Sequence, residues 1–208
     1  WQLLLSVMLA TAFLSMMISN TSSALIMMPM AMAMLAAGGV REGQTDGMAG
    51  ALPMGIAFAA SIGGLGTMIG TPTNAIAVGM IEEGVGERIS FAQWSLYGLP
   101  VALLAIPLAG WIIARVQHLR EDAFDPQAAR TAIGHARAWT IQEKRLLPVM
   151  LGASALWFSQ PWLEDLFPAG AITDGTIAAL AGVVPFVLPH GTGRPPLTWP
   201  AANRAPPG

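Results

Sequence analysis

The sequence predicts an all-α polytopic membrane protein with a re-entrant helical hairpin and a broken transmembrane helix. Of its 208 residues, 54% are hydrophobic and only 11% are charged, whereas a soluble globular domain carries about a quarter charged residues. The charges are also bunched, since no Asp, Glu, Lys or Arg occurs in residues 1–40 or 91–114. Uncharged runs of this length suit a bilayer, which a helix of about 20 apolar residues can cross.

The first apolar region, residues 1–39, carries a polar cluster in its middle. Residues 19–23 read SNTSS, and hydrocarbon does not tolerate such a cluster facing lipid. We therefore expect a re-entrant hairpin whose tip is surrounded by protein or water, rather than a single span.

The second apolar region, residues 48–82, is interrupted by a glycine-rich segment. Residues 63–74 read GGLGTMIGTPTN and include four glycines, a proline and three threonines. Glycine and proline both disfavour the helix interior. The pattern predicts two half-helices joined by unwound backbone.

A conventional span and a charged connector follow. Residues 94–114 are expected to form a transmembrane helix, with kinks at Pro100 and Pro107. Residues 115–145 hold six of the ten Lys and Arg residues, so the positive-inside rule places this connector in the cytoplasm. Because successive membrane crossings alternate in direction, both ends of the first hairpin are then expected on the cytoplasmic side.

The last part of the chain predicts two shorter spans and a tail. Residues 146–189 contain two apolar segments separated by a turn-rich stretch, and residues 190–208 are rich in Pro and Gly. The chain starts without Met inside an apolar stretch and stops without a closing element. We expect both ends to be cuts and the chain to be a fragment of a longer protein.

Composition narrows the function further. The formal net charge of −2 gives no support to a nucleic-acid partner. The absence of cysteine excludes disulfides, thiol catalysis and thiolate metal sites.

The two polar interruptions are the strongest functional signal. In transporters, broken helices bind ions through freed carbonyl groups and bind anions at half-helix N-termini. Hydroxyl and amide oxygens of residues 19–21 suit a hard cation such as sodium, and the N–H groups that open the second arm suit a carboxylate. Small and hydroxyl residues also serve plain helix packing. Pro72 and Asn74 make packing alone less convincing, because proline lacks a donor and asparagine adds an amide to satisfy.

These motifs resemble those of the divalent anion/sodium symporter family. Residues 19–29, SNTSSALIMMP, look like the first Ser-Asn-Thr hairpin of that family. Residues 61–74, SIGGLGTMIGTPTN, look like its GGxGTxIGTPPN loop, with Thr73 in place of the usual second proline. Residues 172–178, ITDGTIA, also look like a family segment, and the resemblance extends over residues 1–189.

The resemblance implies an elevator-type carrier, usually a homodimer, with Na+ as the coupling ion and an inverted repeat. Residues 1–39 and 48–82 then belong to a mobile transport domain, and residues 146–189 to a scaffold-like region that starts the second repeat. The substrate-binding residues carried over from the family are Ser19, Asn20 and Thr21. The sodium ligands carried over are Ser15, Ser19, Asn20, Gly66, Gly70 and Thr71, with Pro72 and Asn74 supporting the loop.

The family's second half supplies another Ser-Asn-Thr hairpin, and this sequence holds no second such triplet. We therefore predict that the 208-residue chain alone is inactive in transport. Neither motif contains Lys or Arg, so a bound dianion must rely on helix dipoles, neutral donors and nearby sodium. Such a site suits C4 dicarboxylates carried across the inner (plasma) membrane, with sulfate or another inorganic anion as an alternative substrate.

Three other functions compete with this interpretation. Proton-coupled carriers of the same ion transporter superfamily would need an intramembrane carboxylate, and neither motif has one. A serine hydrolase would need a base beside its nucleophile, but the three histidines, His118, His135 and His190, are placed in the connector and the tail. A non-transporting membrane assembly partner remains the third reading.

Overall fold

The structure is a computed structural model that describes residues 1–208 except 42, 120–123, 133–139, 164–165, 169–170 and 188–208. The described residues form helices and connecting segments without strands. The chain divides into two compact units, one built from residues 1–89 and 94–136 and the other from residues 90–93 and the described residues after 136. The predicted tail, residues 190–208, lies outside the described residues.

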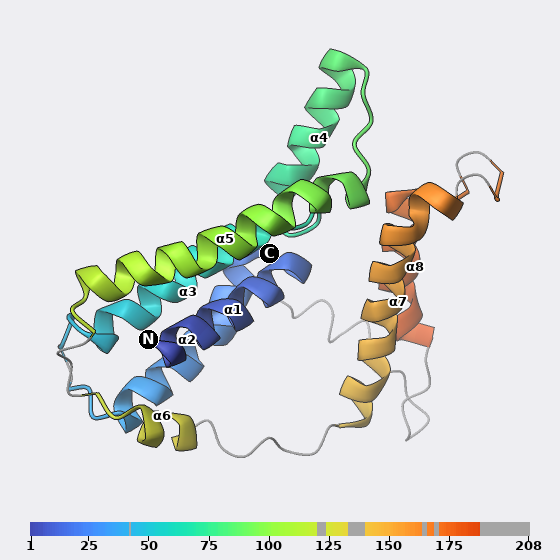
Figure 1. Cartoon of the computed structure of the whole chain (residues 1–208). Helices are drawn as coiled ribbons and strands as arrows, with labels where there is room; N and C mark the ends of the chain where they lie inside the picture. Colours follow the sequence, from blue (N-terminus) through green and yellow to red (C-terminus); the bar gives the residue numbers. More distant parts are fainter. Residues whose placement is uncertain (42, 120–123, 133–139, 164–165, 169–170, 188–208) are drawn as a thin grey trace. The chain divides into compact units, whose positions relative to one another are not determined.

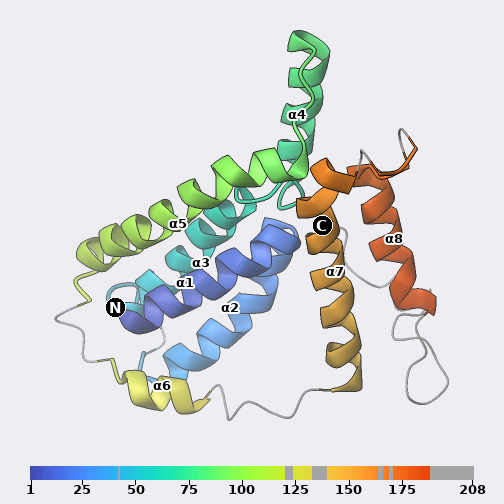
Figure 2. The ribbon, with the colours of Figure 1, turned by 45° about the vertical axis from the view of Figure 1, so that its right-hand side comes forward.

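The first unit begins with two helices that meet at a sharp break. Helix α1 spans Gln2–Met17 and helix α2 spans Asn20–Ala37. The backbone between them is extended at Ile18 and Ser19, so the polar tip predicted from the sequence separates the helices. Both helices run side by side in two views (Figures 1 and 2).

The glycine-rich segment separates the next two helices. Helix α3 spans Met48–Gly64 and helix α4 spans Pro72–Val85. Pro72 occupies the first turn of α4, where its missing N–H costs nothing. Helix α4 ends at Gly86, which adopts a left-handed conformation with a φ of 76° that glycine accepts readily.

Helices α1 and α3 form the most extensive packing, and α2 also packs against α3. Their shared core contains Leu4, Met8, Met34, Leu52 and Ile56, all fully buried. Helix α5, Phe91–Val116, joins this core through Ala102, Ile106 and Ile113. The short helix α6, Pro126–Ala132, packs against α2.

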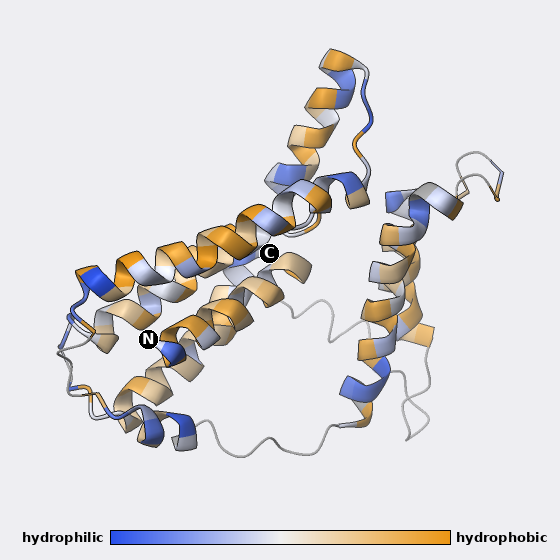
Figure 3. Cartoon of the chain, in the orientation of Figure 1, coloured by the Kyte–Doolittle hydropathy of each residue, from blue (hydrophilic) through white to orange (hydrophobic). Residues whose placement is uncertain are grey.

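Apolar side chains also cover much of the outer surface. Leu96, Leu103, Leu104 and Leu108 of α5 are exposed, and Figure 3 shows hydrophobic colour along most of that helix with hydrophilic residues at its ends. Two helices of the described chain, α2 and α5, are long and apolar enough to cross a membrane. Exposed apolar surface of this kind suits a lipid environment.

The second unit contains helix α7, Ile141–Leu163, and helix α8, Asp174–Val187, which pack against each other. Phe91 belongs to this unit and stacks on Trp157 with the ring centroids 5.0 Å apart. The Trp157 indole donates a hydrogen bond to the carbonyl oxygen of Asp174, which fixes α7 against the start of α8.

Candidate ion and anion site

The hairpin tip brings oxygen atoms of α1 and α2 together. Ser15 lies on the last turn of α1 and is fully buried. Its Oγ lies 2.6 Å from the carbonyl oxygen of Ala60 in α3 and 2.7 Å from Oδ1 of Asn20 in α2. A serine hydroxyl has one proton and can donate to only one of these oxygens. The oxygen that does not receive this proton keeps lone pairs that can bind a cation.

Asn20 links the tip to the glycine-rich segment. A Cβ atom built on Gly64 would lie only 2.3 Å from Asn20 Oδ1, so no other residue type fits at this position without displacing the amide. The neighbouring Gly63 is just as confined, because its Cβ would lie 2.4 Å from the carbonyl oxygen of Ala12. The two motifs thus lie in direct contact although Asn20 and Gly64 are far apart along the chain.

The loop after α3 is fixed by side-chain donors. The Asn74 amide is buried and donates to the carbonyl oxygens of Gly64 and Thr67, both at 2.8 Å. The Thr67 hydroxyl donates in turn to the carbonyl oxygen of Met16 at the end of α1. Gly70 packs on the backbone of Gly64, where a Cβ would meet the carbonyl oxygen at 2.4 Å.

Helix α5 supplies a further contact to the same loop. The Trp94 indole N–H donates to the carbonyl oxygen of Leu65 at 3.0 Å. The Gly66 carbonyl oxygen lies beside Gly98 of α5. Within the described residues this oxygen accepts no hydrogen bond, and neither does the carbonyl oxygen of Gly70. Both keep lone pairs available for a ligand.

Four helix ends surround the break points. Helices α1 and α3 present C-terminal ends, whose free carbonyl groups favour cations. Helices α2 and α4 present N-terminal ends without acidic residues in their first turns, and free N–H groups there favour anions. The same region can therefore serve both charges, as the broken helices of transporters do.

The structure brings together only some of the site residues predicted from the sequence. Ser15 and Asn20 come together, whereas the Ser19 hydroxyl caps α2 by accepting from Ser22 N–H at 3.3 Å and donates to the Ser22 hydroxyl at 2.9 Å. Thr21 is exposed on the first turn of α2. Thr71 is the N-cap residue of α4 and makes no capping bond through its side chain.

Sequence reasoning did not single out Thr67 or Trp94 as site residues. Thr67 lies inside the recognised loop motif, so its hydroxyl was a visible candidate. The bond from Trp94 to Leu65 spans 29 residues, which no local pattern reveals. Asn74 was expected to carry an unsatisfied amide, but both donors of that amide are used.

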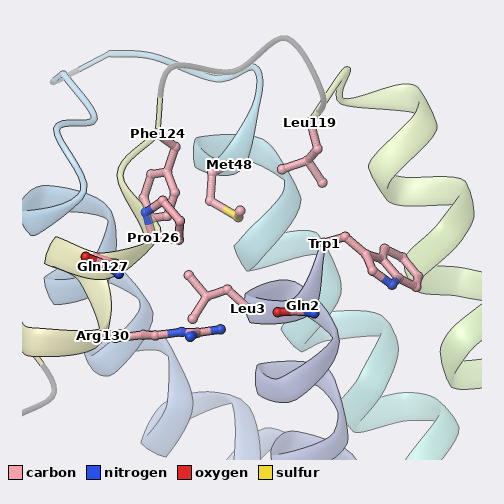
Figure 4. A pocket seen from close by; sticks show the side chains of 9 residues that line it. All are labelled: Trp1, Gln2, Leu3, Met48, Leu119, Phe124, Pro126, Gln127 and Arg130. Atoms are coloured by element: carbon pink, nitrogen blue, oxygen red, sulfur yellow. The ribbon is translucent and has the colours of Figure 1, made fainter.

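A hollow of about 600 Å³ occurs elsewhere in the first unit. Figure 4 shows its lining, which includes Leu3, Met48, Phe124 and Arg130. Because it borders the first turn of α1, it lies about 20 Å along that helix from Ser15. It is therefore separate from the tip and the glycine-rich loop.

The one histidine that the structure describes does not approach the serines of the tip. His118 follows the end of α5, and Val116 at that end is about 27 Å along the helix from Gly98, which packs on the loop. His135 and His190 lie outside the described residues.

Comparison with known proteins agrees with the motifs. The sequence profile of a citrate transporter family, CitMHS, matches residues 1–191. The chain is 34% identical over 199 residues to the sodium-dependent dicarboxylate transporter SdcS of Staphylococcus saprophyticus and 32% identical to SdcS of Staphylococcus aureus strain MW2. Each alignment covers 90% of this chain and 38% of the relative.

The matches confirm the resemblance to sodium-coupled anion carriers that the two motifs indicated. They place the chain among transporters and not among enzymes. The chain spans well under half the length of these curated relatives. It belongs to the citrate transporter family.

Proposed function

We propose that the chain forms the first cation and substrate site of a sodium-coupled carrier for small dianions, with C4 dicarboxylates as the preferred substrates. The observation that carries this proposal is the direct contact between the hairpin tip and the glycine-rich loop, where Ser15 and Asn20 oxygens converge beside Gly64. The names of the SdcS relatives support both sodium dependence and the substrate class.

The cation site would use neutral oxygen atoms. Ser15 and Asn20 supply the close oxygen pair, Ser19 adds a hydroxyl one residue away, and the loop from Gly66 through Gly70 to Thr71 adds carbonyl oxygens. Freed backbone carbonyls at broken helices are the usual sodium ligands of such carriers. Pro72 and Asn74 belong to the support of this loop, since Asn74 ties its two ends together.

The anion site would use the N-terminal end of α2. Ser19, Asn20 and Thr21 stand at its first turn, where backbone N–H groups and the helix dipole attract a carboxylate. No Lys or Arg is present in either motif. A bound cation beside this helix end would therefore supply the main positive charge, which explains why sodium and substrate should bind together.

The polar break between the hairpin arms supports a re-entrant arrangement. Helices α1 and α2 are separated by extended backbone at Ile18 and Ser19, and the Ser15 and Asn20 oxygens meet at this break. Hydrocarbon does not tolerate such polar groups facing lipid, which favours a hairpin whose tip is surrounded by protein or water. We propose an elevator-type, multi-pass inner-membrane carrier that alternates access and forms a homodimer. The mass of the detergent-solubilised protein tests the dimer.

The test is uptake of labelled succinate into proteoliposomes containing the protein made from the whole open reading frame that encodes this sequence. Sodium replaces choline outside the vesicles, and unlabelled sulfate and citrate serve as competitors. Saturable, sodium-dependent succinate uptake that sulfate barely inhibits is the expected result. Uptake that sulfate outcompetes would move the proposal to an inorganic anion permease. No uptake of labelled succinate, and none of labelled sulfate or citrate in parallel assays, would favour the non-transporting membrane partner.

A further inference from the structure

The start of α5 carries two residues that meet the same backbone segment of the glycine-rich loop. Trp94 and Gly98 are four residues apart and therefore lie on one face of the helix. The Trp94 indole donates to the Leu65 carbonyl oxygen at 3.0 Å. A Cβ atom on Gly98 would lie 2.4 Å from that same oxygen and 3.1 Å from the Gly66 carbonyl oxygen.

Gly98 differs from the other glycine of this helix. Its nearest neighbours are loop backbone atoms, which cannot rotate away as a side chain can. Near the other end of α5, a Cβ on Gly110 would meet the sulfur of Met8 at 3.1 Å, and a methionine side chain adapts easily. Close approach of backbone to backbone is thus specific to the end of α5 that touches the loop.

The loop segment held by α5 directly follows the residue that contacts the hairpin tip. Leu65 and Gly66 come after Gly64, which packs on Asn20. Asn74 and Thr67 tie the loop to α3 and to α1, and Trp94 adds a tie to α5. Without the tie from α5, the Leu65 peptide could rotate and carry Gly64 away from Asn20.

We infer that Trp94 and Gly98 are positioning residues that hold the loop against α5 and keep Gly64 in contact with Asn20. This inference rests on the proposed sodium site at the tip. Binding sites need their ligands held to about 0.5 Å by supporting residues. A tryptophan that only anchored the helix at the lipid interface would have no effect on sodium affinity.

The first test compares Trp94→Phe with Trp111→Phe in the protein made from the whole open reading frame. Both changes remove an indole N–H from α5, but Trp111 is 53% exposed and stacks on Arg115. Loss of one hydrogen bond corresponds to about a two- to tenfold change in a binding constant. We expect Trp94→Phe to raise the half-saturating sodium concentration for succinate uptake by that factor, and Trp111→Phe to leave it unchanged.

The second test compares Gly98→Ala with Gly110→Ala and reads the loop itself. Hydrogen exchange followed by mass spectrometry on peptides covering residues 63–74 reports loop fixation without depending on sodium or transport. Faster exchange is expected in Gly98→Ala and Trp94→Phe, with wild-type exchange in Gly110→Ala and Trp111→Phe.

The outcomes separate the two proposals. Unchanged exchange in Trp94→Phe overturns the inference, even if Gly98→Ala expresses too poorly to be measured. Faster exchange with unchanged sodium dependence also overturns it, because the loop would then be held without serving the ion site. If succinate uptake by the wild-type protein does not depend on sodium, the proposed function is refuted instead. Hydrogen exchange of residues 63–74 then decides by itself whether α5 holds the loop.

Discussion

Replacing Asn74 by alanine should loosen the glycine-rich loop and weaken sodium binding together. The Asn74 amide makes two hydrogen bonds of 2.8 Å to carbonyl oxygens of Gly64 and Thr67, and the side chain is 3% exposed. Each such bond contributes about 0.5–1.5 kcal/mol net. The variant should therefore lose about 1–3 kcal/mol of unfolding free energy. The exposed neighbour Thr73 gives a matched control as Thr73→Ala.

The assay is denaturant titration of wild-type and variant proteins in detergent micelles, paired with sodium titration of succinate uptake. A second variant, Asn74→Asp, conserves volume but removes both donors and places a carboxylate against two carbonyl oxygens, so it should be worse than alanine. Exposed substitutions usually change stability by less than about 0.5 kcal/mol. If Asn74→Ala stays within that range of Thr73→Ala and keeps wild-type sodium affinity, the role assigned to the amide is wrong.

Other substitutions test separate parts of the site. Asn20→Ala should impair both sodium and succinate binding, whereas Met27→Leu, which conserves buried apolar volume, should leave uptake kinetics unchanged; equal kinetics for the two would refute the tip assignment. The hydroxyls of Ser23 and Ser95 are fully buried and have no hydrogen-bond partner in the described chain, so Ser23→Ala and Ser95→Ala should be neutral or stabilising by up to about 1 kcal/mol in denaturant titration. A large loss of uptake in either would instead reveal an unassigned ligand role. Thr73→Pro should be tolerated, since proline fits the first turn of a helix; lost expression would show that the Thr73 N–H has a partner.

The sequence predicted the breaks between helices better than it predicted their ends. Polar and glycine-rich runs located the interruptions at the tip and after Gly64. Helix α5 was expected from residue 94 but begins at Phe91, because Ser90 and Gln93 cap each other's backbone N–H groups. Helix α7 likewise begins at Ile141, five residues before its expected apolar segment. Thr140 and Glu143 form a capping box at this start.

A hydropathy pattern does not predict these helix starts because capping residues are polar. Both pairs show the spacing of a capping box, so the signal was present in the sequence. The sequence did not predict which distant segments come into contact. Neither the approach of Asn20 to Gly64 nor the bond from Trp94 to Leu65 follows from periodicity, because each depends on how separate helices cross.

The most direct test of the site is saturable binding of radioactive sodium to the purified protein, compared between Ser15→Ala and Ser6→Ala. Both serines belong to α1, but the Ser6 hydroxyl only donates to the Gln2 carbonyl oxygen at an exposed position, whereas the Ser15 oxygen lies 2.7 Å from Asn20 Oδ1. We expect Ser15→Ala to abolish or strongly weaken sodium binding and Ser6→Ala to bind like the wild type. Wild-type sodium affinity in Ser15→Ala would contradict the placement of the cation at the hairpin tip.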